Sequence, residues 1–201
     1  MTEAPKLSLK EKQWNLREDA ILDAASELMS SKGYNAMTMD DVANLVGISK
    51  ATLYIHFPSK HDLVVSVACR TLDQAYEQIA AIDPDLAPAA RVRELVNKLI
   101  DCRYGAGAPP FIEAIGELIE VLATEPPFIE RDQRNLSFIG EILTSAKNAK
   151  VLVEGIDVLV AVHIIIGTLR CVELQQILDQ KKTTPEAIGD TLIRMLLKPG
   201  V

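Results

Sequence analysis

The chain has 201 residues and a net charge of −7, with 48% hydrophobic but only 4% aromatic residues. This length allows one or two domains with a substantial, mainly aliphatic core. Cys69, Cys102 and Cys171 are odd in number and form no C-x-x-C pair, which favours reduced thiols over a disulfide framework. The most apolar run is too short to span a bilayer, and the N-terminus has no signal-peptide core. We therefore expect a soluble, cytoplasmic protein without a membrane partner.

The overall charge gives no support for a nucleic-acid partner. Residues 1–62 contain seven Lys and Arg against nine Asp and Glu. No acid lies between Asp41 and Asp62, however, and that interval contains Lys50 and Lys60. Phosphate contacts supply most non-specific DNA affinity, and acids elsewhere are screened over about 8 Å at physiological salt. The local charge pattern therefore permits a DNA-facing surface.

The N-terminal part is predicted to contain an arm and a bracing helix. Residues 1–16 carry several lysines and little apolar periodicity, which predicts a mobile basic arm. Such an arm either follows DNA phosphates or is simply a solvated terminus. From Arg17 to Ser31 apolar residues recur at helical spacing, and Gly33 supplies a stop.

The stretch from Thr38 to Asp62 predicts two short helices, a tight turn and the start of a third helix. Thr38, Ser49 and Ser59 are expected to cap the three helix starts, because their hydroxyls accept hydrogen bonds from otherwise unpaired backbone N–H groups. Gly47 falls at the turn between the short helices, where glycine adopts a positive φ without steric cost. The pattern is that of a helix-turn-helix followed by a scaffold helix.

The helix after Ser49 is expected to enter the major groove of DNA. Lys50, Ala51 and Thr52 would then lie near base edges or phosphates. Tyr54 and His56 would contact backbone phosphates, and Thr38 and Lys60 would contact phosphates at helix starts. The alternative is an ordinary three-helix corner, for which the same caps and glycine would suffice. The predicted DNA-contacting residues are Thr38, Ser49, Lys50, Ala51, Thr52, Tyr54, His56 and Lys60.

The rest of the chain is also predicted to be helical, which makes the fold all-α with about nine helices and no strand. The expected helices after the turn segment span residues 59–82, 88–103, 110–125, 128–150, 154–181 and 185–197. The helix from Glu154 to Lys181 is apolar on nearly every side in its first half, so a short chain needs association to cover it. We expect three parts: an arm (1–16), a DNA-binding domain (17–62) and a helical domain (63–201), to which resemblance to a known family assigns ligand binding and dimerisation.

No pattern of catalytic or metal-binding residues is present. The sequence has no G-x-S-x-G, no phosphate-binding loop and no acid/base cluster. The three histidines have no metal-ligand spacing with a cysteine or carboxylate. We expect no enzymatic activity, no metal and no cofactor.

The residues GISKATLYIHFPSKHDL resemble the DNA-reading segment of the tetracycline-repressor-like (TetR) family of bacterial transcriptional regulators, and the likeness extends from about Arg17 to Val67. The resemblance implies a homodimeric repressor that binds a palindromic double-stranded operator and is released by a small, largely apolar effector. It also implies dimerisation through the last two long helices. The expected interface residues are Leu159, Val162, Ile166, Leu169, Leu192 and Leu196.

The resemblance further implies an apolar pocket between the linking helix and the helices that follow. Each residue assigned to it is equally compatible with plain core packing, and His163 is compatible with a satisfied core histidine. The rival function is a helical interaction or enzyme-like protein that uses the cavity without binding DNA. The expected pocket residues are Tyr76, Leu99, Arg103, Phe111, Ile115, Phe138, Ile142 and His163.

Overall fold

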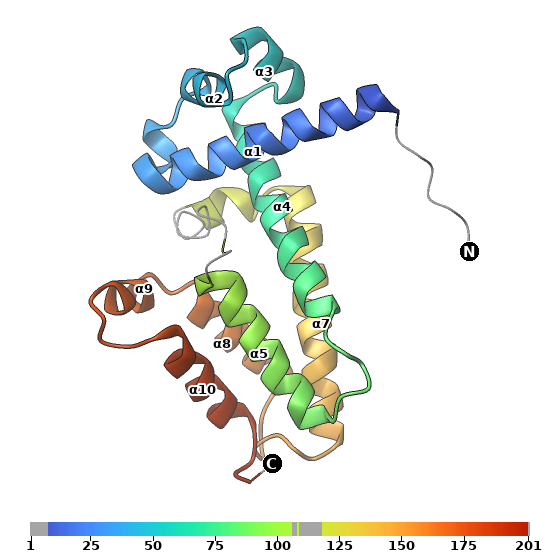
Figure 1. Ribbon diagram of the computed structural model, residues 1–201. Coiled ribbons are helices and arrows are strands. Elements are labelled where there is room, and N and C mark those ends of the chain that lie inside the picture. The colour runs from blue at the N-terminus through green and yellow to red at the C-terminus, as the bar shows by residue number, and fades with distance from the viewer. Residues whose placement is uncertain (1–7, 106–107, 109–117, 201) are drawn as a thin grey trace.

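The computed structural model describes residues 8–105, 108 and 118–200, and these residues form helices and turns without a strand (Figure 1). Within the described ranges nine helices have defined bounds, and residues 118–122 are helical as well. The all-α prediction is confirmed. Leu152 and Leu197 form an isolated antiparallel bridge.

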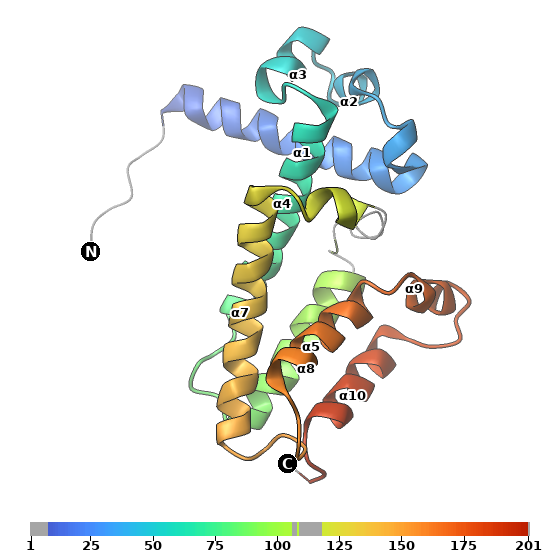
Figure 2. The ribbon, with the colours of Figure 1, turned by 180° about the vertical axis from the view of Figure 1, so that it is seen from behind.

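Helices α1 (Leu9–Ala36), α2 (Met39–Val46) and α3 (Lys50–His56) form a head at one end of the molecule (Figures 1 and 2). The predicted caps are confirmed, because the side chains of Thr38, Ser49 and Ser59 accept hydrogen bonds at the starts of α2, α3 and the following helix. Gly47 has φ 76° and ends α2 in the left-handed conformation, as predicted. The head therefore has the expected helix-turn-helix geometry.

Helix α1 begins earlier than predicted. The Ser8 side chain accepts a hydrogen bond from the Glu11 N–H, and the Glu11 carboxylate accepts one from the Ser8 N–H at 2.8 Å. This capping box starts the helix at Leu9, so residues 9–16 are helical rather than part of an arm; residues 1–7 lie outside the described residues. Gly33, with φ 80°, interrupts the helix where a stop was predicted.

Helix α4 (Lys60–Ala80) connects the head to the larger bundle and runs beside α7 (Pro126–Asn148) (Figure 1). Its first half packs in the core of the head, where Leu63 and Val67 are buried, and Ile79 near its end is buried in the core of the bundle. Leu118, Leu122 and Phe128 also join the head's core. The head is therefore packed against the segment that leads into α7.

The bundle is completed by α5 (Pro88–Tyr104), α8 (Val158–Leu169), α9 (Val172–Asp179) and α10 (Pro185–Leu196), with α8 between α7 and α10 (Figure 2). Its core is mostly aliphatic, as the composition indicated. No single helix in the described part of the chain is both long and apolar enough to cross a membrane; α8 and α9 pass that test only as a pair bent by 45°.

The single long helix predicted for residues 154–181 is wrong. The chain is not helical at 151–157, and α8 and α9 are separate helices that meet at Arg170 and Cys171. In a continuous helix the Leu169 carbonyl would accept a hydrogen bond from the N–H of Glu173. Here it accepts one from Nε of Arg103 on α5 at 2.9 Å, and Nη2 of Arg170 donates to Asp132 on α7 at 2.6 Å. Contacts from other helices therefore hold the break.

Candidate DNA-binding surface and effector pocket

Helix α3 is held in the head by its inner side and exposes its outer side. Leu53 is fully buried and Phe57, at the end of the helix, is nearly so. Lys50, Ala51 and Tyr54 are exposed, as a base-reading face requires. Ile55 is also exposed, at 67%, although the sequence analysis assigned it no contact. An apolar side chain on this face is suited to contact a thymine methyl group.

The hydroxyls at the start of α3 serve the helix itself. The Ser49 side chain accepts a hydrogen bond from the Thr52 N–H at 3.1 Å, and the two hydroxyl oxygens lie 2.8 Å apart. The Thr38 side chain is similarly occupied by the capping box with Asp41. Three of the predicted DNA-contacting residues, Thr38, Ser49 and Thr52, therefore act first in stabilising helix starts.

The two acids beside α3 are neutralised by lysines. Asp40 forms an ion pair with Lys50 at 2.7 Å, and Asp41 forms one with Lys32 at 2.6 Å. The hydrogen bond from Lys32, with those from Thr38, lowers the pKa of Asp41 to about 2. The Lys50–Asp40 pair is more than half exposed, and exposed pairs contribute little to stability, so Lys50 can exchange its partner for a phosphate. The charge at this surface is therefore close to balanced before DNA arrives.

Lys60 lies at the first position of α4, but its side chain folds over the head. Its Nζ is 4.2 Å from the centroid of the Tyr34 ring and donates to the Asn35 carbonyl at 3.4 Å. Partial burial lowers the pKa of Lys60. The ammonium is therefore held within the head by Tyr34 and Asn35.

The structure contradicts the predicted phosphate contact of His56. Its imidazole stacks on Trp14 of α1, with the ring centroids 3.8 Å apart, and both ring nitrogens are buried with no hydrogen-bond partner among the described residues. Burial lowers the pKa of His56, so the ring is neutral at physiological pH. The prediction failed because Trp14 was placed in a mobile arm, whereas it lies on α1 and covers the histidine.

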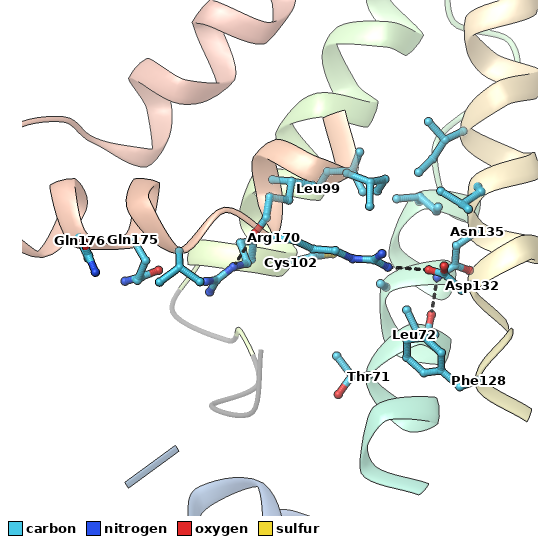
Figure 3. Close-up of a pocket in the computed structure, with 18 of the residues that line it drawn as sticks. Thr71, Leu72, Leu99, Cys102, Phe128, Asp132, Asn135, Arg170, Gln175 and Gln176 are labelled. Atoms are coloured by element: carbon cyan, nitrogen blue, oxygen red, sulfur yellow. Dashed lines mark hydrogen bonds and ion pairs between the residues drawn. The ribbon is translucent and has the colours of Figure 1, made fainter. Parts of the chain in front are cut away.

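A cavity of about 340 Å³ lies between α4, α5, α7, α8 and α9 (Figure 3). Its lining is mostly apolar, and it includes Leu99 and Arg103 as predicted. A second, more polar cavity of about 610 Å³ adjoins it and shares Arg103, Gln175 and Asp179 with it. Lys181 also lines the second cavity. An apolar chamber thus borders a polar region that carries cationic side chains.

Four of the predicted pocket residues lie elsewhere. Tyr76 contacts Phe138 edge to face, with the ring centroids 5.7 Å apart, and neither lines the cavity. Ile142 is buried in the core of the bundle. His163 is exposed on α8, where its Nδ1 donates to the Leu159 carbonyl at 2.8 Å. Phe111 and Ile115 lie outside the described residues.

The cavity is also lined by polar residues that the sequence analysis did not assign. Asp132 and Asn135 come from α7, Arg170 from the junction of α8 and α9, and Gln175 from α9. Asp132 and Arg170 form the ion pair described above. Helical periodicity marks such residues only as polar interruptions of an apolar pattern, which gives no information about which helix they face.

Residues 21–67 match the family model described as bacterial regulatory proteins, tetR family. Residues 21–67 therefore form a TetR-family DNA-binding domain. The chain is a DNA-binding transcriptional regulator, as the sequence predicted. The fatty acid metabolism regulator protein of Bacillus subtilis (strain 168) is 23% identical over 181 residues, which cover 88% of this chain and 92% of that protein.

Two solved structures share the fold of this chain over about nine tenths of its length. AibR, in complex with isovaleryl coenzyme A and operator DNA, has a TM-score of 0.73 and 23% identity, and the match covers 90% of this chain and 98% of AibR. FadR from Bacillus subtilis, in complex with stearoyl-CoA, has a TM-score of 0.69 and 19% identity, with coverage of 91% and 98%. At these identities the likeness establishes the fold.

The TetR-like bundle buries four of the six residues predicted to form the dimer interface. Val162, Leu169, Leu192 and Leu196 each expose 7% or less, because α8 and α10 pack these sides into the protomer's own core. Ile166 is partly buried and lines the cavity. Only Leu159 is exposed, at 68%. The monomer therefore contradicts an interface made by the four buried residues.

A different apolar face of the same two helices is open. Leu159, Val160 and Ile164 on α8 and Met195 on α10 are exposed large hydrophobic residues. Val160, Ile164 and Met195 line a groove of about 280 Å³ between the helices. Most of the predicted interface residues lie on the core-facing sides of these two helices, because a composition that is apolar all round does not indicate which side faces the core.

Proposed function

We propose that the protein is a homodimeric transcriptional repressor that binds a palindromic operator in the cytoplasm and is released by an acyl thioester of coenzyme A. It has no catalytic role in this proposal. The observation that carries the proposal is an apolar cavity, bordered by a polar one, in a bundle joined through a single long helix to a TetR-family DNA-binding head.

DNA binding would use the exposed side of α3. Tyr54 and Ile55 project from the middle of this helix, and Lys50 and Ala51 from its first turn. The side chains of its first turn would approach base edges and phosphates, while the N-terminal end of α4 with Lys60 would approach the backbone. Residues 1–7 with the first turn of α1 are proposed to follow adjacent phosphates.

The dimer would form through the open face of α8 and α10. Contiguous exposed apolar residues on a monomer mark an interaction surface. A two-fold dimer buries the same patch on both subunits, and it presents two heads to half-sites about 34 Å apart or a multiple of that spacing. Leu159, Val160, Ile164 and Met195 would form the centre of this interface.

An acyl-coenzyme A would match both cavities at once. The acyl chain would occupy the apolar cavity, and the anionic coenzyme A portion would lie toward the polar cavity that carries Arg103 and Lys181. Structures of two relatives with this fold contain such thioesters, isovaleryl coenzyme A in AibR and stearoyl-CoA in FadR. These relatives support the proposed effector class, and no particular acyl group is assigned to this chain.

Release would act through α4. Thr71, Leu72 and Ile79 of this helix line the cavity, and the same helix begins in the core of the head. His61, at the start of α4, also contacts the carboxylate of Glu125, which lies just before α7, at 2.9 Å. A ligand that moves α4 would change the separation of the two heads in the dimer and so lower operator affinity.

To test this proposal, the affinity for labelled operator DNA is measured by fluorescence anisotropy while stearoyl-CoA or isovaleryl-CoA is added. At least one thioester is expected to weaken DNA binding by about fivefold or more, which is the usual lower range of allosteric coupling. Free coenzyme A is the control, because it lacks the acyl chain. Operator binding that no thioester changes would contradict the effector class and leave DNA binding intact.

A further inference from the structure

Helices α4 and α7 both run from the head into the bundle, side by side (Figures 1 and 2). The head's core contains Leu63 and Val67 of α4, and it also contains Phe128 from the first turn of α7. His61 and Glu125 join the same two helix starts through their contact at 2.9 Å. Helix α4 is thus the covalent connection between head and bundle, and α7 is a second contact between them.

A cluster of five side chains fastens α4 to α7 beyond the head. The Asp73 carboxylate of α4 accepts hydrogen bonds from Nε of Arg131 and Nη2 of Arg134 on α7, both at 2.8 Å. The Arg134 guanidinium also lies over the ring of Tyr76 on α4, 4.1 Å from its centroid, and Tyr76 contacts Phe138 of α7 edge to face. We call these five residues the Asp73 cluster.

The Asp73 cluster holds the two helices more firmly than an ordinary surface ion pair. The Asp73 side chain is 37% exposed, and a single ion pair at such exposure contributes little to stability. Here, however, one carboxylate is held by two guanidinium groups, and such charge-assisted networks are stronger than single pairs. Partial burial opposes ionisation, but the hydrogen bonds from both arginines outweigh it and lower the pKa of Asp73. The carboxylate therefore stays charged and is held at two points of α7.

The apolar cavity lies against other sides of the same two helices. Its lining from α4 is Thr71, Leu72, Ala75 and Ile79. Its lining from α7 is Phe128, Asp132, Asn135, Leu136 and Ile139. None of the five residues of the Asp73 cluster belongs to the lining. Since a helix has about 3.6 residues per turn, the lining and the cluster occupy different sides of each helix. A ligand in the cavity would therefore press on α4 and α7 without contacting the cluster.

The position of the Asp73 cluster limits how the two helices can respond to a ligand. If α4 and α7 could part, a ligand would be accommodated between them without moving the head. Because the cluster holds them together on a side that the ligand does not reach, they would move as a pair relative to α8 and α9. The ion pair of Asp132 on α7 with Arg170, at the junction of α8 and α9, lines the cavity and is open to such a displacement.

We infer that α4 and α7 transmit effector binding to the head as one unit, and that Asp73 is the positioning residue that holds them together. This inference rests on the proposed function and extends it, because release of DNA then requires the coupled movement of both helices rather than of α4 alone. Asp73 contacts neither the cavity nor the DNA-binding surface, so its role is confined to the coupling between the two sites.

The experiment measures a coupling factor, which is the operator Kd at saturating thioester divided by the operator Kd without it. Anisotropy titrations of the full chain use stearoyl-CoA and isovaleryl-CoA as probes. The unmodified chain is expected to give a factor of about five or more with at least one of them. Asp73→Ala removes the acceptor of both arginines and is expected to lower that factor below about two. Its operator affinity without thioester, and its thioester affinity by calorimetry, should stay within about twofold of the unmodified values, which a loss of folding would not allow.

Further variants separate this positioning role from a general effect on stability. Asp73→Glu keeps a carboxylate at the same position and should restore most of the coupling. Asp23→Ala is the matched control, because it removes another ion pair of α4, that of Arg70 with Asp23 on α1 at 2.7 Å, and should keep the coupling. If Asp73→Ala does not fold, Arg131→Met combined with Arg134→Met removes the same hydrogen bonds from α7 with residues that favour a helix.

Each outcome decides for or against the role of Asp73. If the unmodified chain responds to a thioester and folded Asp73→Ala responds equally, the helices do not need the cluster, and this inference is overturned while the proposed function stands. Equal loss of coupling in Asp73→Ala and Asp23→Ala would also overturn it, because Asp73 would then have no distinct role. If neither thioester changes the operator affinity of the unmodified chain, both the proposed effector class and this inference are wrong.

Discussion

Replacing Ala51 with glutamate is expected to lower operator affinity by about a hundredfold or more, which corresponds to about 2.7 kcal/mol. Ala51 is exposed in the first turn of α3, next to Lys50, so the larger side chain meets no core residue. An acid in the first turn also suits the helix dipole. In the DNA complex, however, its carboxylate would face the phosphates and base edges of the groove, where negative charge opposes binding.

The matched control for this prediction is Ala187→Glu. Ala187 is exposed in the first turn of α10, a helix of the bundle rather than of the head, so the variant carries the same change of charge and type (Figure 1). Anisotropy titrations at one salt concentration should show near-native affinity for Ala187→Glu, and circular dichroism should show unchanged helix content for both. An Ala51→Glu protein that is folded and binds DNA normally would remove α3 from the interface.

The second large effect is expected from Ile164→Asp, which should convert the proposed dimer to a monomer at micromolar concentration. Ile164 is 49% exposed within the protomer and lines the groove between α8 and α10. The substitution leaves the protomer core intact, but it would place two carboxylates near the two-fold axis of an apolar interface, where an unpaired buried charge costs several kcal/mol. Sedimentation velocity measures the change directly.

Leu9→Asp is the control for the dimer prediction. Leu9 is an exposed apolar residue of the same size as Ile164. It is 74% exposed at the start of α1 and lies on neither α8 nor α10. The control should sediment as the unmodified chain does. Operator affinity of the Ile164→Asp monomer should also fall, because one head loses the contribution of the second half-site. A folded Ile164→Asp protein that remains dimeric would exclude this face.

The structure of the head could be predicted from the sequence because the residues that determine it act over short distances along the chain. Helix caps, such as Thr38 and Ser49, and turn glycines, such as Gly47, affect only residues within three or four positions. Their sequence pattern is therefore enough to predict the local structure. The early start of α1 was available from the same kind of signal, since Ser8 and Glu11 have capping-box spacing. That signal was missed because the surrounding residues lack apolar periodicity.

Features that depend on contacts between distant residues were not predictable in this way. The break between α8 and α9 depends on Arg103 reaching the Leu169 carbonyl across 66 positions of sequence. The burial of His56 depends on Trp14. The apolar length of α8 concealed which side joins the protomer core, so Val162 was assigned to an interface that the fold does not leave open.

Only part of the pocket could be predicted for the same reason. Leu99 and Arg103 were assigned from the family resemblance and do line the cavity. Asn135 was not assigned, because a single polar residue in an amphipathic helix is ordinarily solvent-facing. Its burial follows from the packing of α7 against α4, where Leu72 supplies the carbonyl that holds it.

We expect this chain to bind DNA as a two-fold pair of heads, and selection of bound DNA from a random-sequence pool tests this most directly. The selection is expected to enrich an inverted repeat whose half-sites are centred about 34 Å apart, or a multiple of that distance. Enrichment should be lost with Ala51→Glu and retained with Ala187→Glu. Recovery of no enriched sequence, or of a single unpaired half-site by the dimeric protein, would contradict the account.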